Sequence, residues 1–248
     1  MSCSSEPEPE PLQSDSESAS CATPSPTLVV LSFRTLFMFY YETVLRDTDP
    51  SDLSNCAKAS MNAGDQISIF WRPGAREFLQ WMLNDFPNHY PLKLGLISNS
   101  LTSEDLRRVI CSILETMGWG PPGHAPGGLV VGKHHIHLFG YEYVDYVETV
   151  SGTKQRPRWN PIVTHTGSEE DKSMLVIEGT GIYADMEAIN ALIVPPFIQD
   201  VLQTWAWDET CDEELKKLRY YLDKFFFRLH CERRGDVKEL LECELYSE

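Results

Sequence analysis

A continuous run of β-prone apolar residues is followed by segments that alternate between helix-like and strand-like patterns. Residues 27–31 read Thr-Leu-Val-Val-Leu, which is the pattern of a strand buried on both faces. Apolar residues recur at helical spacing over residues 75–86, a strand-like run covers residues 92–97, and another helical pattern covers residues 103–117. Strands and helices in alternation predict a parallel sheet with helices on its faces. We therefore expect an α/β fold.

The composition changes abruptly at the start of the first strand. Residues 1–26 are dominated by Ser, Glu and Pro and cannot bury enough apolar area to offset their chain entropy. We expect this segment to be a disordered acidic tail. Residues 27–248 should form the folded domain, with irregular polar insertions at about residues 45–66 and 133–172.

Shorter patterns predict the remaining elements of the domain. Further strands are expected at residues 67–70, 129–131 and 174–178. Pro73 should lie in the first turn of the helix over residues 75–86. The last long helix should open at a capping-box pattern over residues 210–213 and bury one stripe of side chains. That stripe consists of Leu215, Leu218, Leu222, Phe225 and Leu229.

Charge and cysteine usage restrict the classes of partner and compartment. The chain carries 21 Lys and Arg against 37 Asp and Glu, a formal net charge of −16, which argues against binding bare nucleic acid. Its apolar runs are shorter than the roughly 18 residues that cross a bilayer, so we expect no membrane span. The seven cysteines are scattered, and no basic residue precedes Arg34. These features favour free thiols and a nuclear or cytoplasmic location over secretory or mitochondrial targeting.

Polar residues follow three of the predicted strands. Residues 31–35 are Leu-Ser-Phe-Arg-Thr, residues 98–100 are Ser-Asn-Ser, and residues 178–180 are Glu-Gly-Thr. The functional crevice of a parallel α/β sheet lies beyond the carboxyl ends of its strands. We therefore expect any functional site to be built from these three segments.

In order and spacing these segments resemble one branch of the haloacid dehalogenase (HAD) superfamily. Residues 28–36 have the frame of that superfamily's first motif, in which a strand delivers Asp-x-Asp-x-Thr. Residues 72–74, Arg-Pro-Gly, resemble the start of a helix in the branch that contains the RNA polymerase II C-terminal-domain phosphatases and the NLI-interacting-factor-like proteins. Residues 98–101 stand where this branch has Thr-Ala-Ser-Leu, and residues 176–180 are similar to its Asp-Asn-Ser turn. The resemblance spans roughly residues 27–245 and implies a HAD-like Rossmannoid fold.

The chain differs from the family pattern at the catalytic and metal-binding positions. Enzymes of the superfamily transfer a phosphoryl group to the first Asp and use the second Asp as acid and base. The frame places Leu31 and Phe33 at these positions, and neither side chain can serve. The family's Mg²⁺ needs oxygen ligands, and Glu178 is the residual candidate. A lone carboxylate is a poor magnesium site, so we expect no catalytic residue and no cofactor.

Polar groups that the chain retains at the family's motif positions could still bind an anion. Thr35 and Ser98 carry hydroxyls, and Ser98 stands at the position of the family's phosphate-binding residue. The competing interpretation is that each hydroxyl bonds to the backbone. The family also has a Lys that neutralises phosphoryl charge, for which Lys154 is the best candidate and Lys133 the alternative, unless either is simply solvated.

Two other sequence patterns suggest a catalytic loop and a metal site, but each lacks residues that such a site needs. Residues 230–231, His-Cys, resemble the opening of a cysteine-phosphatase loop, but Val237 stands where that loop needs Arg. Three histidines lie within residues 134–137, and on a strand His135 and His137 would share a face. Further metal ligands at suitable spacing are not evident, so an edge strand or an insertion is the favoured interpretation.

Aromatic residues could instead serve a binding role. Tyr141, Tyr143 and Tyr146 would form an anchor patch if they point outward, because Tyr is enriched in interface hot spots. Residues 225–227 are three consecutive Phe, which requires either that the helix is enclosed on two sides or that one ring is exposed.

The leading hypothesis is a pseudophosphatase, a catalytically inactive phosphatase-like protein that acts as a protein-binding or regulatory module. One alternative is a divergent magnesium-dependent protein serine/threonine phosphatase, in which Glu178 and Asp185 help to build a different metal site. Another is a protein like the mitochondrial inner-membrane presequence receptor, which belongs to the same branch. The absence of a presequence pattern and of an apolar span argues against that third interpretation.

Overall fold

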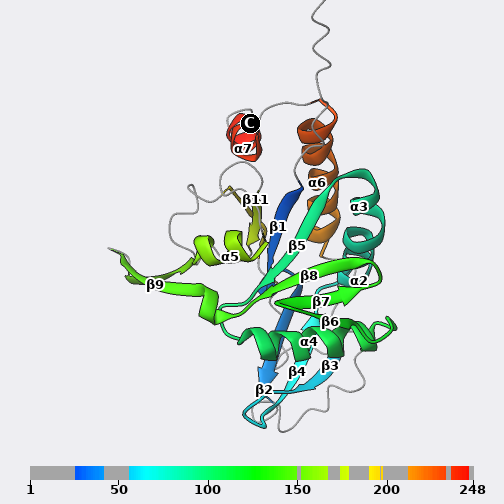
Figure 1. Ribbon diagram of the computed structural model, residues 1–248, viewed down its shortest axis with the longest axis vertical. Coiled ribbons are helices and arrows are strands. Elements are labelled where there is room, and N and C mark those ends of the chain that lie inside the picture. Colours follow the sequence, from blue (N-terminus) through cyan, green and yellow to red (C-terminus); the bar gives the residue numbers. More distant parts are fainter. Residues whose placement is uncertain are drawn as a thin grey trace, which may run out of the picture.

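The computed structural model describes residues 26–41, 56–149, 152–166, 174–178, 190–195, 197, 212–232 and 236–245. A seven-stranded sheet with the order β12-β11-β1-β5-β8-β7-β6 forms its centre (Figure 1). Its parallel strands are β1 (Thr27–Ser32), β5 (Leu92–Ile97), β8 (His134–Phe139), β11 (Met174–Glu178) and β12 (Ala191–Ile193). β7 (Gly128–Val131) and β6 (Gly123–Ala125) continue one edge in antiparallel pairing. The expected α/β class with a mainly parallel sheet is confirmed.

The first strand lies in the middle of the parallel part. All six residues of β1 are buried, as the continuous apolar run predicted. Leu31 pairs with Leu96 of β5 on one side and with Ile177 of β11 on the other. The chain thus adds β5 and β8 on one side of β1, and later places β11 and β12 on the other side. Such a reversal of strand order opens a crevice at the carboxyl ends of the neighbouring strands.

A second, smaller sheet follows β1. A single helical turn, α1 (Phe33–Leu36), leads from β1 into three antiparallel strands in the order β2-β4-β3. These strands are β2 (Phe37–Tyr41), β3 (Cys56–Ser60) and β4 (Gln66–Trp71). The strand expected at residues 67–70 exists within β4, but it belongs to this sheet rather than to the parallel one. The polar insertion expected at residues 45–66 is wrong for its second half, because β3 occupies residues 56–60. Residues 45–55 lie outside the described residues.

The second predicted helix runs through three consecutive segments. They are α2 (Ala75–Gln80), a π-helical segment (Trp81–Asp85) and α3 (Phe86–His89). Gly74 precedes them as the N-cap with a φ of 77°, so Pro73 lies before the helix and not in its first turn. Pro87 has no N–H to donate, and the wider π turn just before it accommodates that loss within a continuous helix.

The remaining helices agree in part with the sequence patterns. α4 (Ser103–Thr116) is capped by Thr102, whose side chain accepts a hydrogen bond from the Asp105 N–H. α6 (Glu214–His230) is N-capped by Glu213, and the Asp212 carboxylate accepts from the Glu214 N–H. Thr210 and Cys211 of the predicted capping box lie outside the described residues. The other helices are α5 (Trp159–Thr166) and α7 (Val237–Leu245).

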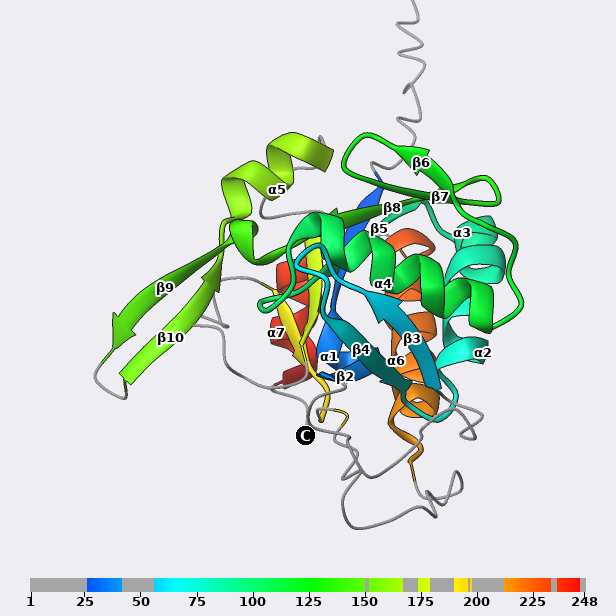
Figure 2. The same cartoon turned by 90° about the horizontal axis from the view of Figure 1, so that it is seen from below.

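The irregular insertion predicted at residues 133–172 is wrong for residues 134–149 and 152–166, and its last part, residues 167–172, lies outside the described residues. This stretch contributes β8 to the main sheet, a hairpin of β9 (Val144–Thr149) and β10 (Gly152–Pro157), and α5. Figure 2 shows the hairpin projecting from the body of the molecule. The three histidines made β8 resemble a polar segment. Ile136 and Leu138, on the face opposite to His135 and His137, are both buried in the core.

The sheet has an extensive apolar core on one face and a smaller one on the other. The larger cluster joins Val29 and Leu31 of β1 to apolar residues of α2, α4, α6 and α7. The smaller cluster joins Leu28 and Val30 to Ile162 of α5. Gly95 of β5 permits close packing on that second face, because a Cβ there would lie 2.8 Å from Cε2 of Phe139. Within the described part of the chain, no helix is long and apolar enough to span a membrane.

Candidate functional site

The three predicted site segments come together where the strand order reverses. Ser32, at the end of β1, pairs with Ile97, so Ser98 follows at the same edge of the sheet. The Ser98 N–H donates to the Phe139 carbonyl at 2.8 Å. Glu178 ends the neighbouring β11, and its carbonyl accepts from the Val194 N–H at 2.9 Å. Gly179 and Thr180 lie outside the described residues.

The two residues at the family's acid positions are part of the hydrophobic core. Leu31 is 0% exposed and Phe33 is 2% exposed, and both belong to the larger apolar cluster. The Phe33 ring packs against Phe37 at 5.2 Å and against Phe39 at 6.2 Å between centroids. An ionised carboxylate at either position would be buried among hydrocarbon, which costs several kcal/mol unless it is paired.

The two hydroxyl candidates differ in their hydrogen bonding. Oγ of Ser98 accepts from the backbone N–H groups of Ser100 at 3.3 Å and Leu101 at 3.2 Å. Ser98 therefore stabilises the turn after β5, as the backbone-bonding interpretation proposed. Thr35 is fully buried, and within the described part of the chain its Oγ1 has no hydrogen-bond partner.

The magnesium site implied by the resemblance does not fit the described residues. Glu178 is fully buried at the end of β11, whereas Leu31 and Phe33 offer no oxygen ligand. No group of three or more potential metal-ligating His, Cys, Asp or Glu side chains occurs among the residues that the structure describes. Asp185, the partner proposed for Glu178 in the enzyme alternative, lies outside them. One carboxylate does not provide the oxygen cage that Mg²⁺ requires.

The two candidate lysines lie in different places. Lys154 is in β10 opposite Val147, and the next residue, Gln155, accepts a hydrogen bond from the Asn99 side chain at 2.6 Å. That bond brings the hairpin next to the end of β5. Lys133 instead precedes β8 at the opposite edge of the sheet, where its Nζ donates to the Asn88 side chain at 3.2 Å. Lys133 is therefore wrong as a site residue.

Arg72 connects the elements around this edge, a role that the sequence did not reveal. It is 3% exposed, and its Nε forms an ion pair with the Asp212 carboxylate at 2.7 Å. Its NH1 group donates to the carbonyls of Pro195 at 2.7 Å and Thr35 at 3.3 Å. Arg72 thus holds α1, the segment after β12 and the start of α6 together. The Arg-Pro-Gly pattern was the available signal for a special role of Arg72. It does not identify the partners, because Pro195 and Asp212 lie 123 and 140 residues after Arg72 in the sequence.

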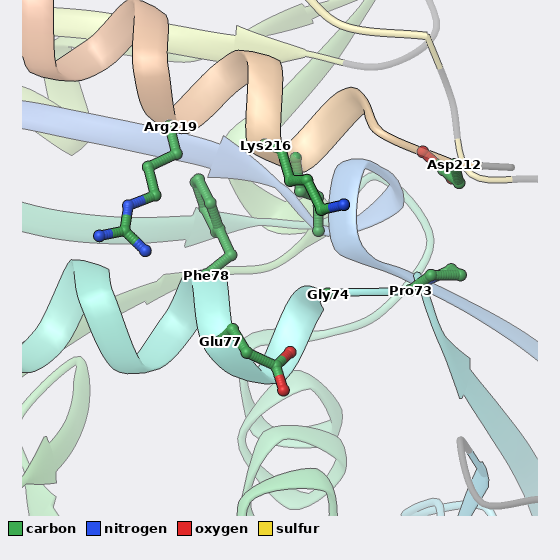
Figure 3. A pocket seen from close by; sticks show the side chains of 8 residues that line it. Pro73, Gly74, Glu77, Phe78, Asp212, Lys216 and Arg219 are labelled. Atoms are coloured by element: carbon green, nitrogen blue, oxygen red, sulfur yellow. The ribbon is translucent and has the colours of Figure 1, made fainter. Parts of the chain in front are cut away.

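A cavity of about 220 Å³ lies beside this ion pair, between α2 and α6. Figure 3 shows Phe78 extending from α2 toward α6, near Lys216 and Arg219. The Arg219 guanidinium also lies over the Trp81 ring, 5.1 Å from its centroid. The volume is below the roughly 300–1,000 Å³ of typical small-molecule sites. Its lining combines apolar side chains, Phe78 and Leu215, with charged groups around them.

The histidines of β8 and the residues that resemble a cysteine-phosphatase loop do not form a reactive site among the described residues. His135 and His137 share a face of β8, as expected, with ring centroids 4.2 Å apart. The expected edge strand or insertion is wrong, because β8 pairs with β5 and β7 on its two sides. The His230 ring packs against Tyr90 and Phe226. Val237, which stands where a phosphatase loop needs Arg, is buried in the core.

Some of the aromatic residues are exposed as the binding hypothesis requires. Tyr141 is 48% exposed and Tyr146 is 64% exposed, whereas Tyr143 packs partly against the smaller core. Phe227 is 50% exposed, while Phe225 and Phe226 are buried. The second alternative for the three Phe residues is therefore correct.

No protein-family model matches the chain, and no curated protein matches it.

Proposed function

We propose that this chain is a catalytically inactive phosphatase-like protein that acts by binding another protein. Its suggested ancestry is the branch of the HAD superfamily that contains the RNA polymerase II C-terminal-domain phosphatases and the NLI-interacting-factor-like proteins. The observation that carries the proposal is the burial of Leu31 and Phe33 in the core at the end of β1.

The topology supports the suggested ancestry. Three of the four segments that resemble family motifs, those around residues 31–35, 98–101 and 178–180, are far apart in the sequence, yet they follow three adjacent strands, β1, β5 and β11. β1 is the strand beside which the strand order reverses, and it would deliver the nucleophile of an active enzyme. This spatial arrangement is compatible with the suggested ancestry and supports it, although the chemical groups differ.

The side chains support the loss of catalysis. Transfer through a covalent intermediate requires a nucleophile and a positioned proton donor. The side chains of Leu31 and Phe33 provide neither, and both are almost completely excluded from solvent. Glu178 alone cannot replace the two acids and the metal.

The exposed aromatic residues support a binding role. Tyr146 lies on the projecting β9–β10 hairpin, and Tyr141 lies just before it. Exposed Tyr side chains on a projecting hairpin are suited to anchor a protein partner. We place the chain in the nucleus or cytoplasm, with no bare nucleic acid among its partners, in keeping with its formal net charge of −16.

A phosphatase assay tests this proposal. The full chain is incubated with Mg²⁺ and either p-nitrophenyl phosphate or a phosphoserine peptide, and phosphate release is measured with and without a chelator. We expect release at the rate of the blank. Glu178→Gln is the diagnostic variant, and Glu115→Gln on the exposed surface of α4 is its control. Turnover that is lost with chelator and with Glu178→Gln, but not with Glu115→Gln, would establish the enzyme alternative.

A further inference from the structure

A second cavity, of about 380 Å³, lies at the amino ends of β5 and β8. These amino ends lie at the opposite end of the parallel strands from the candidate site, as the course of β5 in Figure 1 shows. Its volume is within the range of small-molecule sites. Its polar lining consists of Lys93, Lys133, His134, His135, His137 and Thr166, and apolar residues of the neighbouring helix complete the wall.

The lining is basic in a chain that is strongly acidic as a whole. Lys93 and Lys133 contribute ammonium groups, and His134, His135 and His137 contribute imidazoles. Among the described residues that line the cavity, none is Asp or Glu. In a chain with a formal net charge of −16, this is a local concentration of cationic and hydrogen-bonding groups. Such an enclosure attracts anions, because the field of fixed charges is stronger where water is partly excluded.

We propose that this cavity binds a small phosphoryl-type oxyanion, either free phosphate or the phosphate group of a small metabolite. The inference does not depend on the proposed function, because the two sites lie at opposite ends of the strands.

The register of the sheet brings the basic groups together. Gly95 pairs with His137, so Lys93, two residues earlier on β5, is next to His135 and projects from the same face. The Lys93 Nζ donates to the carbonyl of Thr166 at the end of α5, which fixes the ammonium group at the cavity wall. The His135 and His137 rings lie with their centroids 4.2 Å apart. Two imidazoles and an ammonium group therefore converge on one space.

A metal ion is the competing ligand for two imidazoles on one strand. The ammonium groups of Lys93 and Lys133 line the same cavity, however, and would repel a divalent cation. Carboxylates or thiolates that would complete a metal site do not join these histidines within the described part of the chain. The same positive charges that disfavour a cation stabilise an oxyanion, which also accepts N–H donors at several oxygens.

Calorimetric titration of the full chain with inorganic phosphate at pH 7 tests the proposal. We expect saturable binding at one site, and we expect Lys93→Met and Lys133→Met each to weaken it by about tenfold or more. Lys58→Met on the exposed side of β3 is the matched control and should leave the affinity unchanged. Glycerol phosphate and sulfate are titrated in parallel. Tighter binding of the ester than of free phosphate identifies a metabolite as the source, and the reverse order identifies free phosphate.

Imidazole NMR signals of the unmodified chain provide a readout that does not rely on variants folding. Phosphate should shift the signals of His135 and His137 and leave that of the exposed His124 unchanged. The proposal is overturned by an absence of saturable binding, by equal affinity of Lys93→Met and the unmodified chain, or by Zn²⁺ shifting these signals where phosphate does not.

Discussion

Buried polar groups around the carboxyl edge of the sheet have very different surroundings. Oγ of Ser98 accepts two backbone N–H groups, whereas Oγ1 of Thr35 has no partner among the described residues. A hydroxyl that loses its water without gaining a hydrogen bond destabilises the folded state, and a satisfied one does not. Sequence reasoning placed both hydroxyls at the site. It could not distinguish them, because the difference depends on which backbone groups the turn after each strand presents.

Thr35→Val should therefore leave the free energy of unfolding unchanged or raise it by up to about 1 kcal/mol. Valine has nearly the same shape and removes the unsatisfied oxygen. Ser98→Ala should lower the free energy of unfolding by about 1 kcal/mol, because two backbone donors lose their acceptor. Urea denaturation of both variants measures the contrast. A larger loss for Thr35→Val than for Ser98→Ala would contradict the hydrogen bonding described here.

Arg72→Met should lower the free energy of unfolding by about 3–5 kcal/mol, because it removes one partner of a largely buried ion pair. The carbonyls of Thr35 and Pro195 would lose their donor at the same time. Arg76→Met, on the exposed side of α2, is the control and should change the free energy by no more than about 0.5 kcal/mol. Equal effects of the two substitutions would show that Arg72 does not hold these elements together.

At the scale of elements, strands and helices with a continuous or periodic apolar pattern were predictable. β1, β5, β11 and α4 follow such patterns closely. β8 was missed because His134, His135 and His137 do not register as apolar, although His137 is buried as Ile136 and Leu138 are. β3 was missed because its inward residues are Ala57 and Ala59, which give a weak signal.

His230, at the end of α6, makes the stability of the fold depend on pH. Burial holds the pKa of His230 below its ordinary value of 6.5. Above that value the imidazole is neutral in both the folded and the unfolded chain. Below it, the unfolded chain binds a proton that the folded chain resists, so stability falls as the pH drops. The pKa of His134 is lowered too, first by burial and then by Lys133, and this acts in the same direction.

His230→Phe should reduce the loss of stability between pH 7.5 and pH 5.5, because phenylalanine retains the packing against Tyr90 and Phe226 without titrating. Urea unfolding at the two pH values measures the loss. His124→Phe on the exposed β6 strand should show the same loss as the unmodified chain. If the His230→Phe variant also shows the full loss, His230 does not contribute to the acid sensitivity.

At the scale of the whole molecule, the sequence correctly predicted that the segments after β1, β5 and β11 lie at one edge of the sheet. Parallel strands end at one edge, so the residues that follow β1, β5 and β11 had to lie close together. The part that could not be predicted depends on contacts distant in sequence. Arg72 finds its partners in two later segments, and the basic cavity requires α5 to approach the start of β5. Neither arrangement is encoded in a local pattern.

The central claim is that the end of β1 belongs to the core and holds no divalent metal. Manganese binds to the same oxygen ligands as magnesium and broadens the NMR signals of nearby amides. Substoichiometric Mn²⁺ is therefore added to the ¹⁵N-labelled full chain while amide signals are recorded. We predict no selective broadening at Ser32, Phe33, Thr35 or Ser98. Selective broadening of these amides, reversed by excess Mg²⁺, would contradict the account.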